Sequence, residues 1–197
     1  LDNDFEYTGG AIFTFLTPYA LLVGLMTVLL MAVHGGLYLL LKTHGSLHER
    51  IARRINKAYV GFLVLFVAVA VYSLLTPHLA ANTAQSPALI VIAVLLLVSI
   101  LSIAIFIKKG DYKKAFVGTI LTIVFFMLIV ALQLHPVFLR NTEIIGHDIT
   151  VYNAAASTKS LEIMLTIAAI GAPLLLIYTY FAYKVFWGKV TIDEHSY

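Results

Sequence analysis

Five apolar stretches of about 20 residues, none containing Asp, Glu, Lys or Arg, dominate this chain of 197 residues. A helix needs about 20 mostly apolar residues to cross a hydrocarbon core about 30 Å thick. We therefore expect an all-α integral membrane protein, with one multi-pass membrane domain over residues 1–197. The expected transmembrane helices are 18–41, 58–76, 88–107, 115–134 and 163–183.

The composition agrees with a membrane protein and excludes several other classes. The chain is 61% hydrophobic and 12% charged, whereas soluble domains are about half apolar and a quarter charged. A net charge of +3 is too small and too scattered for a nucleic-acid interface, so we expect no nucleic-acid partner. Because the chain has no cysteine, it has neither disulfides nor thiolate metal sites.

The basic residues predict how the chain is oriented in the lipid bilayer. Eleven Lys and Arg residues lie on one side of the membrane, and only Arg140 and Lys159 lie on the other. The positive-inside rule then places the N-terminus outside and the C-terminus in the cytoplasm. The eleven are Lys42, Arg50, Arg53, Arg54, Lys57, Lys108, Lys109, Lys113, Lys114, Lys184 and Lys189.

Two further expectations come from the segments around the spans. The basic, amphipathic stretch 50–57 is expected to continue the second helix into the cytoplasm and to touch anionic lipid headgroups. An outside N-terminus needs something upstream to carry it across the membrane. We therefore expect a missing N-terminal part, either removed from this chain or carried on another polypeptide.

One ionisable side chain, His34, falls inside the predicted spans. Such residues are costly in lipid and are candidates for function, here as an axial haem ligand or as a proton or quinone group. The alternative is a neutral imidazole bonded to a neighbouring helix, with Gly35 and Gly36 allowing close packing. This alternative is favoured, because no second histidine lies at the same depth on another span. We therefore predict no catalytic, cofactor-binding or metal-binding residue in this chain.

Pro173, in the middle of the fifth span, removes one backbone hydrogen bond and is expected to kink the helix. Transporters place substrate sites at broken helices, usually in symmetric pairs. The first four spans have no second mid-membrane proline. Half of a secondary transporter is therefore an alternative interpretation, and a membrane scaffold without a redox partner is a third.

Two regions resemble subunit II of the cytochrome bd-type quinol oxidases. Residues 15–54 contain LTPYALLVGL and then HGGLYLLLKTHGSLHER. Residues 153–190 begin NAAAST, continue through PLLLIYT and leave the membrane as YKVFWGKV, followed by Thr191. Tyr7-Thr8-Gly9-Gly10 also resembles the approach to that family's fifth helix. Together these motifs cover about half the chain, whereas the second to fourth spans match only in length and polarity.

This resemblance implies that the chain is the C-terminal half of subunit II, folded as a four-helix bundle plus one peripheral helix. Its partners would be the haem-bearing subunit I, the N-terminal half of subunit II and the lipid bilayer. In the family, the b-type and d-type haems and the quinol site belong to subunit I, so no cofactor is expected here.

The resemblance also implies a cellular location and a function. The expected location is the bacterial or archaeal cytoplasmic (inner) membrane. There the chain would act as the non-haem subunit of a quinol:oxygen oxidoreductase that reduces oxygen to water. It would stabilise subunit I and help to generate proton-motive force, and it would not be catalytic alone.

Overall fold

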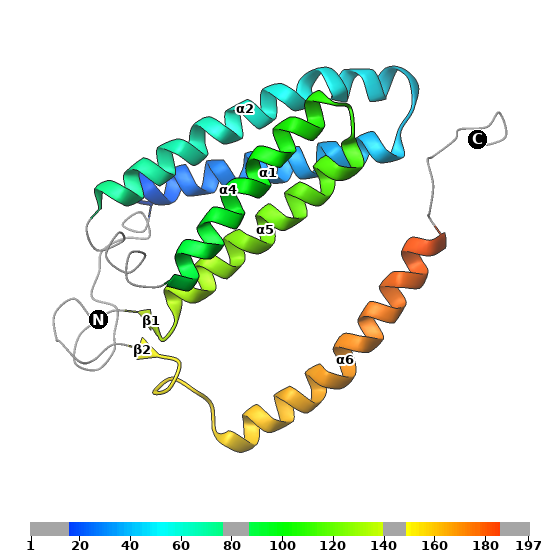
Figure 1. The fold of residues 1–197 in the computed structure, drawn as a ribbon. Helices are drawn as coiled ribbons and strands as arrows, with labels where there is room; N and C mark the ends of the chain where they lie inside the picture. The colour runs from blue at the N-terminus through cyan, green and yellow to red at the C-terminus, as the bar shows by residue number, and fades with distance from the viewer. Residues whose placement is uncertain (1–15, 77–86, 140–148, 186–197) are drawn as a thin grey trace. The chain divides into compact units, whose positions relative to one another are not determined.

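The computed structural model describes residues 16–76, 87–139 and 149–185 (Figure 1). All five helices in these ranges are long and apolar enough to cross a membrane, which confirms the predicted all-α membrane class. One short antiparallel pair of strands accompanies them. The elements are α1 (Pro18–Lys42), α2 (Gly45–Leu75), α4 (Pro87–Lys108), α5 (Tyr112–Leu134), β1 (Val137–Leu139), β2 (Ile149–Thr150) and α6 (Thr158–Val185).

The helix ends follow local backbone chemistry more closely than hydropathy. Thr17 caps α1, with its Oγ1 accepting a hydrogen bond from the Ala20 amide at 3.2 Å, and Pro18 occupies the first helical position. Helix α2 begins at Gly45, well before the predicted span, because the basic stretch 50–57 is helical as expected. Gly45 itself has φ +64°, a left-handed conformation that glycine adopts without strain.

The first compact unit of the chain ends at Leu134 and contains α1, α2, α4 and α5. Helix α4 packs on α5, and α1 packs on both α2 and α5. The buried residues recur at alternating steps of three and four, which is the spacing of left-handed helix bundles. On α1 they are Met26, Leu30, Val33, Leu37 and Leu40, on α2 Ile55, Tyr59 and Phe62, and on α4 Leu96, Ile100, Ile103 and Ile107.

The two basic turns of this bundle lie at the same end (Figure 1). The His48 ring near the start of α2 contacts the Tyr112 ring at the start of α5, with centroids 5.8 Å apart. We call residues 42–57 and 108–114 the basic end of the bundle. The arrangement is what the positive-inside rule requires, and its cytoplasmic location stays a prediction. Arg140 and Lys189 lie outside the described residues.

The second unit starts at His135 and contains the β1–β2 pair and α6. The amide of Val151 donates to the Pro136 carbonyl at 2.8 Å, which closes the connection next to the strands. Helix α6 has no buried residue and runs through Pro173 as one continuous helix. Because the chain separates into two units, the expected single domain over 1–197 stays a prediction.

Candidate functional site around His34

His34 on α1 faces α5 in the membrane-spanning part of the bundle. Its Nδ1 atom lies 2.8 Å from Thr119 Oγ1. The imidazole also stacks on the Phe116 ring, with centroids 4.6 Å apart and an angle of 22° between the planes. The side chain is therefore held both by a hydrogen bond and by an aromatic contact to the same neighbouring helix.

The hydrogen bonds of Thr119 indicate which nitrogen of His34 carries the proton. The Thr119 hydroxyl donates to the Phe116 carbonyl at 2.7 Å, which uses its single hydrogen. It must then accept from His34, so Nδ1 carries a proton. A neutral imidazole in this tautomer satisfies the contact without placing a charge in the membrane.

A second group of hydroxyls joins α4 to α5 close to this site. Ser99 Oγ and Thr122 Oγ1 are 3.0 Å apart, and both side chains are buried. Each also bonds a backbone carbonyl of its own helix, at Leu96 and Gly118 respectively. These internal bonds satisfy the polar groups locally, as hydroxyls in membrane helices commonly do.

Gly118 explains how α4 and α5 can approach so closely at these hydroxyls. A Cβ atom at Gly118 would lie 3.0 Å from Ile103 Cγ1 and 3.1 Å from Ser102 Oγ. Small residues at a helix interface allow this approach, which places short hydroxyl side chains within bonding distance.

The two glycines after His34 play different parts. A Cβ at Gly36 would come within 2.7 Å of Ile55 Cδ1 on α2, so Gly36 is tightly packed. A Cβ at Gly35 would meet nothing within 4 Å. We expected both glycines to allow close helix packing, but the structure gives this role to Gly36 alone. Gly35 instead borders open space.

Pro173 lies on α6, in the second unit of the chain. Helix α6 continues through Pro173, and the kink that the sequence predicts there stays a prediction. Leu174, next to it, is 62% exposed. Among the described residues, Pro173 therefore belongs to a helix without buried side chains.

The described contacts of the His34 imidazole join α1 to α5, since Nδ1 bonds Thr119 and the Phe116 ring covers one face. Neither contact involves Nε2, so the expectation that His34 binds no haem stays a prediction. Among the described residues, no group of three or more His, Asp or Glu side chains is arranged to hold a metal ion. The chemistry that this arrangement supports is hydrogen bonding between helices.

Two features escaped the sequence analysis. Thr119 was a candidate only for bonding to its own helix. It lies seven residues from the start of α5, and His34 lies eight residues from the end of α1. Their similar depths identify the pair only once α5 is known to be a neighbour of α1. Tyr59 was not singled out, and its hydroxyl donates to the Ile100 carbonyl on α4 at 2.6 Å.

Comparison with known proteins gives one consistent family. Residues 2–186 match the family described as cytochrome bd terminal oxidase subunit II. The chain is 24% identical to subunit 2 of cytochrome bd-I ubiquinol oxidase from Escherichia coli K12, covering 95% of this chain and 57% of that relative. It is 28% identical to cytochrome bd ubiquinol oxidase subunit 2 from Bacillus subtilis 168, covering 91% and 53%. The chain therefore spans about half the length of the curated relatives it matches.

Proposed function

Because the chain belongs to the cytochrome bd terminal oxidase subunit II family, we propose that it is the C-terminal half of subunit II in a quinol:oxygen oxidoreductase. The complex oxidises quinol, reduces oxygen to water and generates proton-motive force by charge separation. The match to the family over residues 2–186 carries this proposal. The resemblance of the motifs in residues 15–54 and 153–190 supports it.

In this proposal the chain itself holds no haem. The b-type and d-type haems and the quinol belong to subunit I, where they supply the redox chemistry. The sequence supports this assignment, because no second histidine lies at the depth of His34 on another predicted span. His34 then acts as a positioning residue that joins α1 to α5.

The task of the chain is to stabilise the haem-bearing subunit. Apolar side chains on α6 support this role, since none is buried within the described residues. In the assembled complex, lipid or the other polypeptides cover these surfaces. The relatives are nearly twice as long as the matched region, and this supports an N-terminal half of subunit II as a further partner.

The proposed location is the bacterial inner membrane, with the basic end of the bundle in the cytoplasm. Nine Lys and Arg residues between 42 and 114 gather at this end. Anionic lipid headgroups and the positive-inside rule both favour such an arrangement. The transporter alternative is not favoured, because the family that the chain matches is a terminal oxidase subunit.

The experiment is to purify the complex from native membranes in mild detergent through a tag on this chain. A dithionite-reduced minus air-oxidised spectrum is expected to show b-type and d-type haem bands that elute together with a larger subunit. A haem-free chain without that subunit contradicts the proposal. A haem-free homo-oligomer would instead favour the membrane scaffold.

The role of His34 is tested on the same complex. We expect His34→Ala to leave the haem content per complex unchanged, because in this proposal the haems belong to subunit I and the His34 imidazole joins α1 to α5 through Thr119. Thr119→Val serves as the matched control, since it removes the same hydrogen bond from the other side. Loss of one b-type haem in His34→Ala but not in Thr119→Val would make His34 a ligand and overturn its structural assignment.

A further inference from the structure

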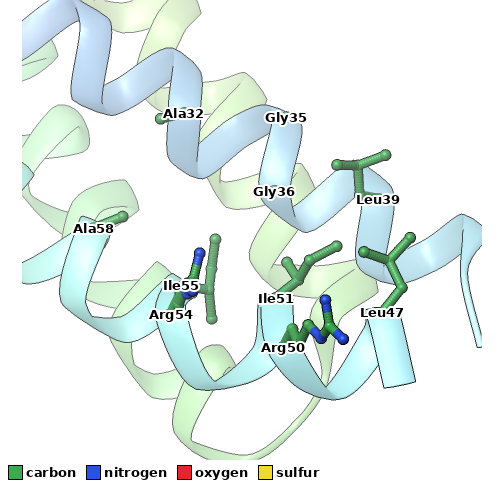
Figure 2. A pocket seen from close by; sticks show the side chains of 10 residues that line it. All are labelled: Ala32, Gly35, Gly36, Leu39, Leu47, Arg50, Ile51, Arg54, Ile55 and Ala58. Atoms are coloured by element: carbon green, nitrogen blue, oxygen red, sulfur yellow. The ribbon is translucent and has the colours of Figure 1, made fainter. Parts of the chain in front are cut away.

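A groove of about 560 Å³ lies between α1 and the first turns of α2, at the basic end of the bundle. Its volume is within the range of about 300–1,000 Å³ that is typical of small-ligand sites. Figure 2 shows the two helices that form it, with Gly35 and Gly36 on α1 opposite Ile51 and Ile55 on α2. The remaining lining residues are Ala32, Leu39, Leu47, Arg50, Arg54 and Ala58.

The glycines create this groove. Gly35 has open space where a Cβ would stand, whereas the side chain of Ile55 fills the space beside Gly36. The groove therefore widens at Gly35 and has an apolar floor at Ile55. Such a channel suits a hydrocarbon chain, which needs a smooth apolar wall and no hydrogen-bonding partners.

Two arginines line the same groove one helical turn apart. Arg50 and Arg54 are both exposed, and neither forms an ion pair with another described residue. Residues four apart lie on the same face of a helix, so both guanidinium groups can reach one anion. Arginine recognises phosphate through paired hydrogen bonds.

The position of this arginine pair along the membrane-spanning part of the bundle indicates that the anion is a lipid headgroup. Ile55 contacts the position of Gly36, which lies six residues before Lys42 at the end of α1. At 1.5 Å per residue, this contact is about 9 Å from the end of that helix. Arg54, next to Ile55, thus begins beside the apolar part of α1, and its long side chain extends toward the interface.

We infer that this groove binds an anionic glycerophospholipid of the leaflet at the basic end. The phosphate lies between Arg50 and Arg54, and one acyl chain follows the groove past Gly35. Basic pockets between membrane helices on the cytoplasmic side are suited to such headgroups. This inference needs only the membrane location of the bundle and is independent of the redox role of the complex.

The test uses the purified complex that contains the chain, stripped of lipid in detergent. It is titrated with palmitoyl-oleoyl phosphatidylglycerol or with the zwitterionic phosphatidylcholine of the same acyl chains, and bound lipid is counted by native mass spectrometry. We expect preference for phosphatidylglycerol. Arg50→Gln with Arg54→Gln should weaken its binding by about tenfold, because each basic contact near the surface contributes to the attraction.

Arg53→Gln is the matched control, because it removes one charge from the same turn of α2 but lies outside the groove lining. We expect it to change phosphatidylglycerol binding by less than about twofold. Equal losses from Arg53→Gln and from either single groove variant, Arg50→Gln or Arg54→Gln, would show general surface attraction and overturn the site. Unchanged binding in the double variant would overturn it as well.

Gly35→Leu tests the acyl-chain part separately. A Cβ at Gly35 would meet nothing within 4 Å and Gly35 lines the groove, so we expect the variant to fold and its side chain to occupy the groove. A phosphatidylglycerol with a diazirine on its acyl chain is expected to cross-link to residues 32–39 or 51–58 in the wild type and not in Gly35→Leu. Cross-links elsewhere, or a polypeptide of the complex seated in the groove, would contradict the inference.

Discussion

Helices α1 and α6 look alike in sequence and differ in their surroundings. Their most apolar 18-residue windows have equal mean hydropathy, yet 22% of that window is buried in α1 and none of it in α6. Helix α1 packs against two helices of its own unit. The comparison teaches that hydropathy identifies a helix for the membrane, whereas packing partners decide which of its faces becomes a core.

The difference in packing between the bundle and α6 is tested most directly by removing one large side chain from each. Phe62 on α2 is fully buried, whereas Leu175 on α6 is 67% exposed. In lipid the surroundings of the Phe62 side chain are apolar in both the folded and the unfolded state. The main cost of Phe62→Ala is therefore the cavity that it leaves. We expect a loss of about 2 kcal/mol and almost no change for Leu175→Ala in the isolated chain.

The measurement is the unfolding free energy of the chain in mild detergent, from sodium dodecyl sulfate titration followed by circular dichroism. Comparable losses in the two variants would mean that α6 has a packed face within this chain. If Leu175→Ala becomes costly only in the complex, a partner polypeptide covers that face.

The next prediction sharpens the description of the bundle itself. Gly36→Ala places a Cβ against Ile55 Cδ1, and overpacking of this kind costs about 1–2 kcal/mol. Ile55→Val removes that Cδ1 atom and should restore most of the loss. Gly35→Ala is the neighbouring control, with no atom within 4 Å of the new Cβ. The same titration measures all variants, and a Gly36→Ala loss that Ile55→Val does not reduce would refute the contact.

A smaller effect is expected from the polar contact between α1 and α5. A double-mutant cycle of His34→Ala and Thr119→Val should give a coupling free energy of about 0.6–1.5 kcal/mol, typical of hydrogen bonds between membrane helices. The hydroxyl of Thr27, on α1 itself, donates to the Val23 carbonyl of its own helix at 2.9 Å. His34→Ala and Thr27→Val should therefore show no coupling. A coupling free energy near zero for His34 and Thr119 would mean that their hydrogen bond does not stabilise the bundle.

Much of the fold could be predicted, because apolar length determines which segments cross a membrane. The predicted first span, 18–41, differs from α1 by one residue, since Thr17, Pro18 and Lys42 mark its ends in sequence. The contacts could not be predicted in the same way. Several hydroxyls had the right chemistry to partner His34, and only the pairing of α1 with α5 selects Thr119. The groove at Gly35 likewise depends on how α2 crosses α1.

The smallest predicted effect is a difference in pH dependence between the N-terminal ends of α5 and α6. The residues that precede these two helices differ in chemistry. Asp111 precedes α5, where its carboxylate accepts a hydrogen bond from the Lys114 amide at 3.2 Å and lies 2.9 Å from Lys114 Nζ. The Lys114 side chain, followed by its amide, holds the pKa of Asp111 below the ordinary value of 3.8. Ser157 precedes α6 and accepts from the Ser160 amide at 3.4 Å without a titrating group.

Because the pKa of Asp111 is lower in the folded chain, its stabilising contribution is complete above the unfolded value and is lost as the pH falls through the folded value. Protection of the Lys114 amide from hydrogen exchange, corrected for intrinsic exchange, should therefore fall below about pH 3.8. Asp111→Asn keeps a capping oxygen and should remove this pH dependence. The Ser160 amide should show no matching step. A fall in amide protection of equal size at Lys114 and Ser160 would indicate general acid unfolding. It would contradict a specific role for the Asp111 carboxylate.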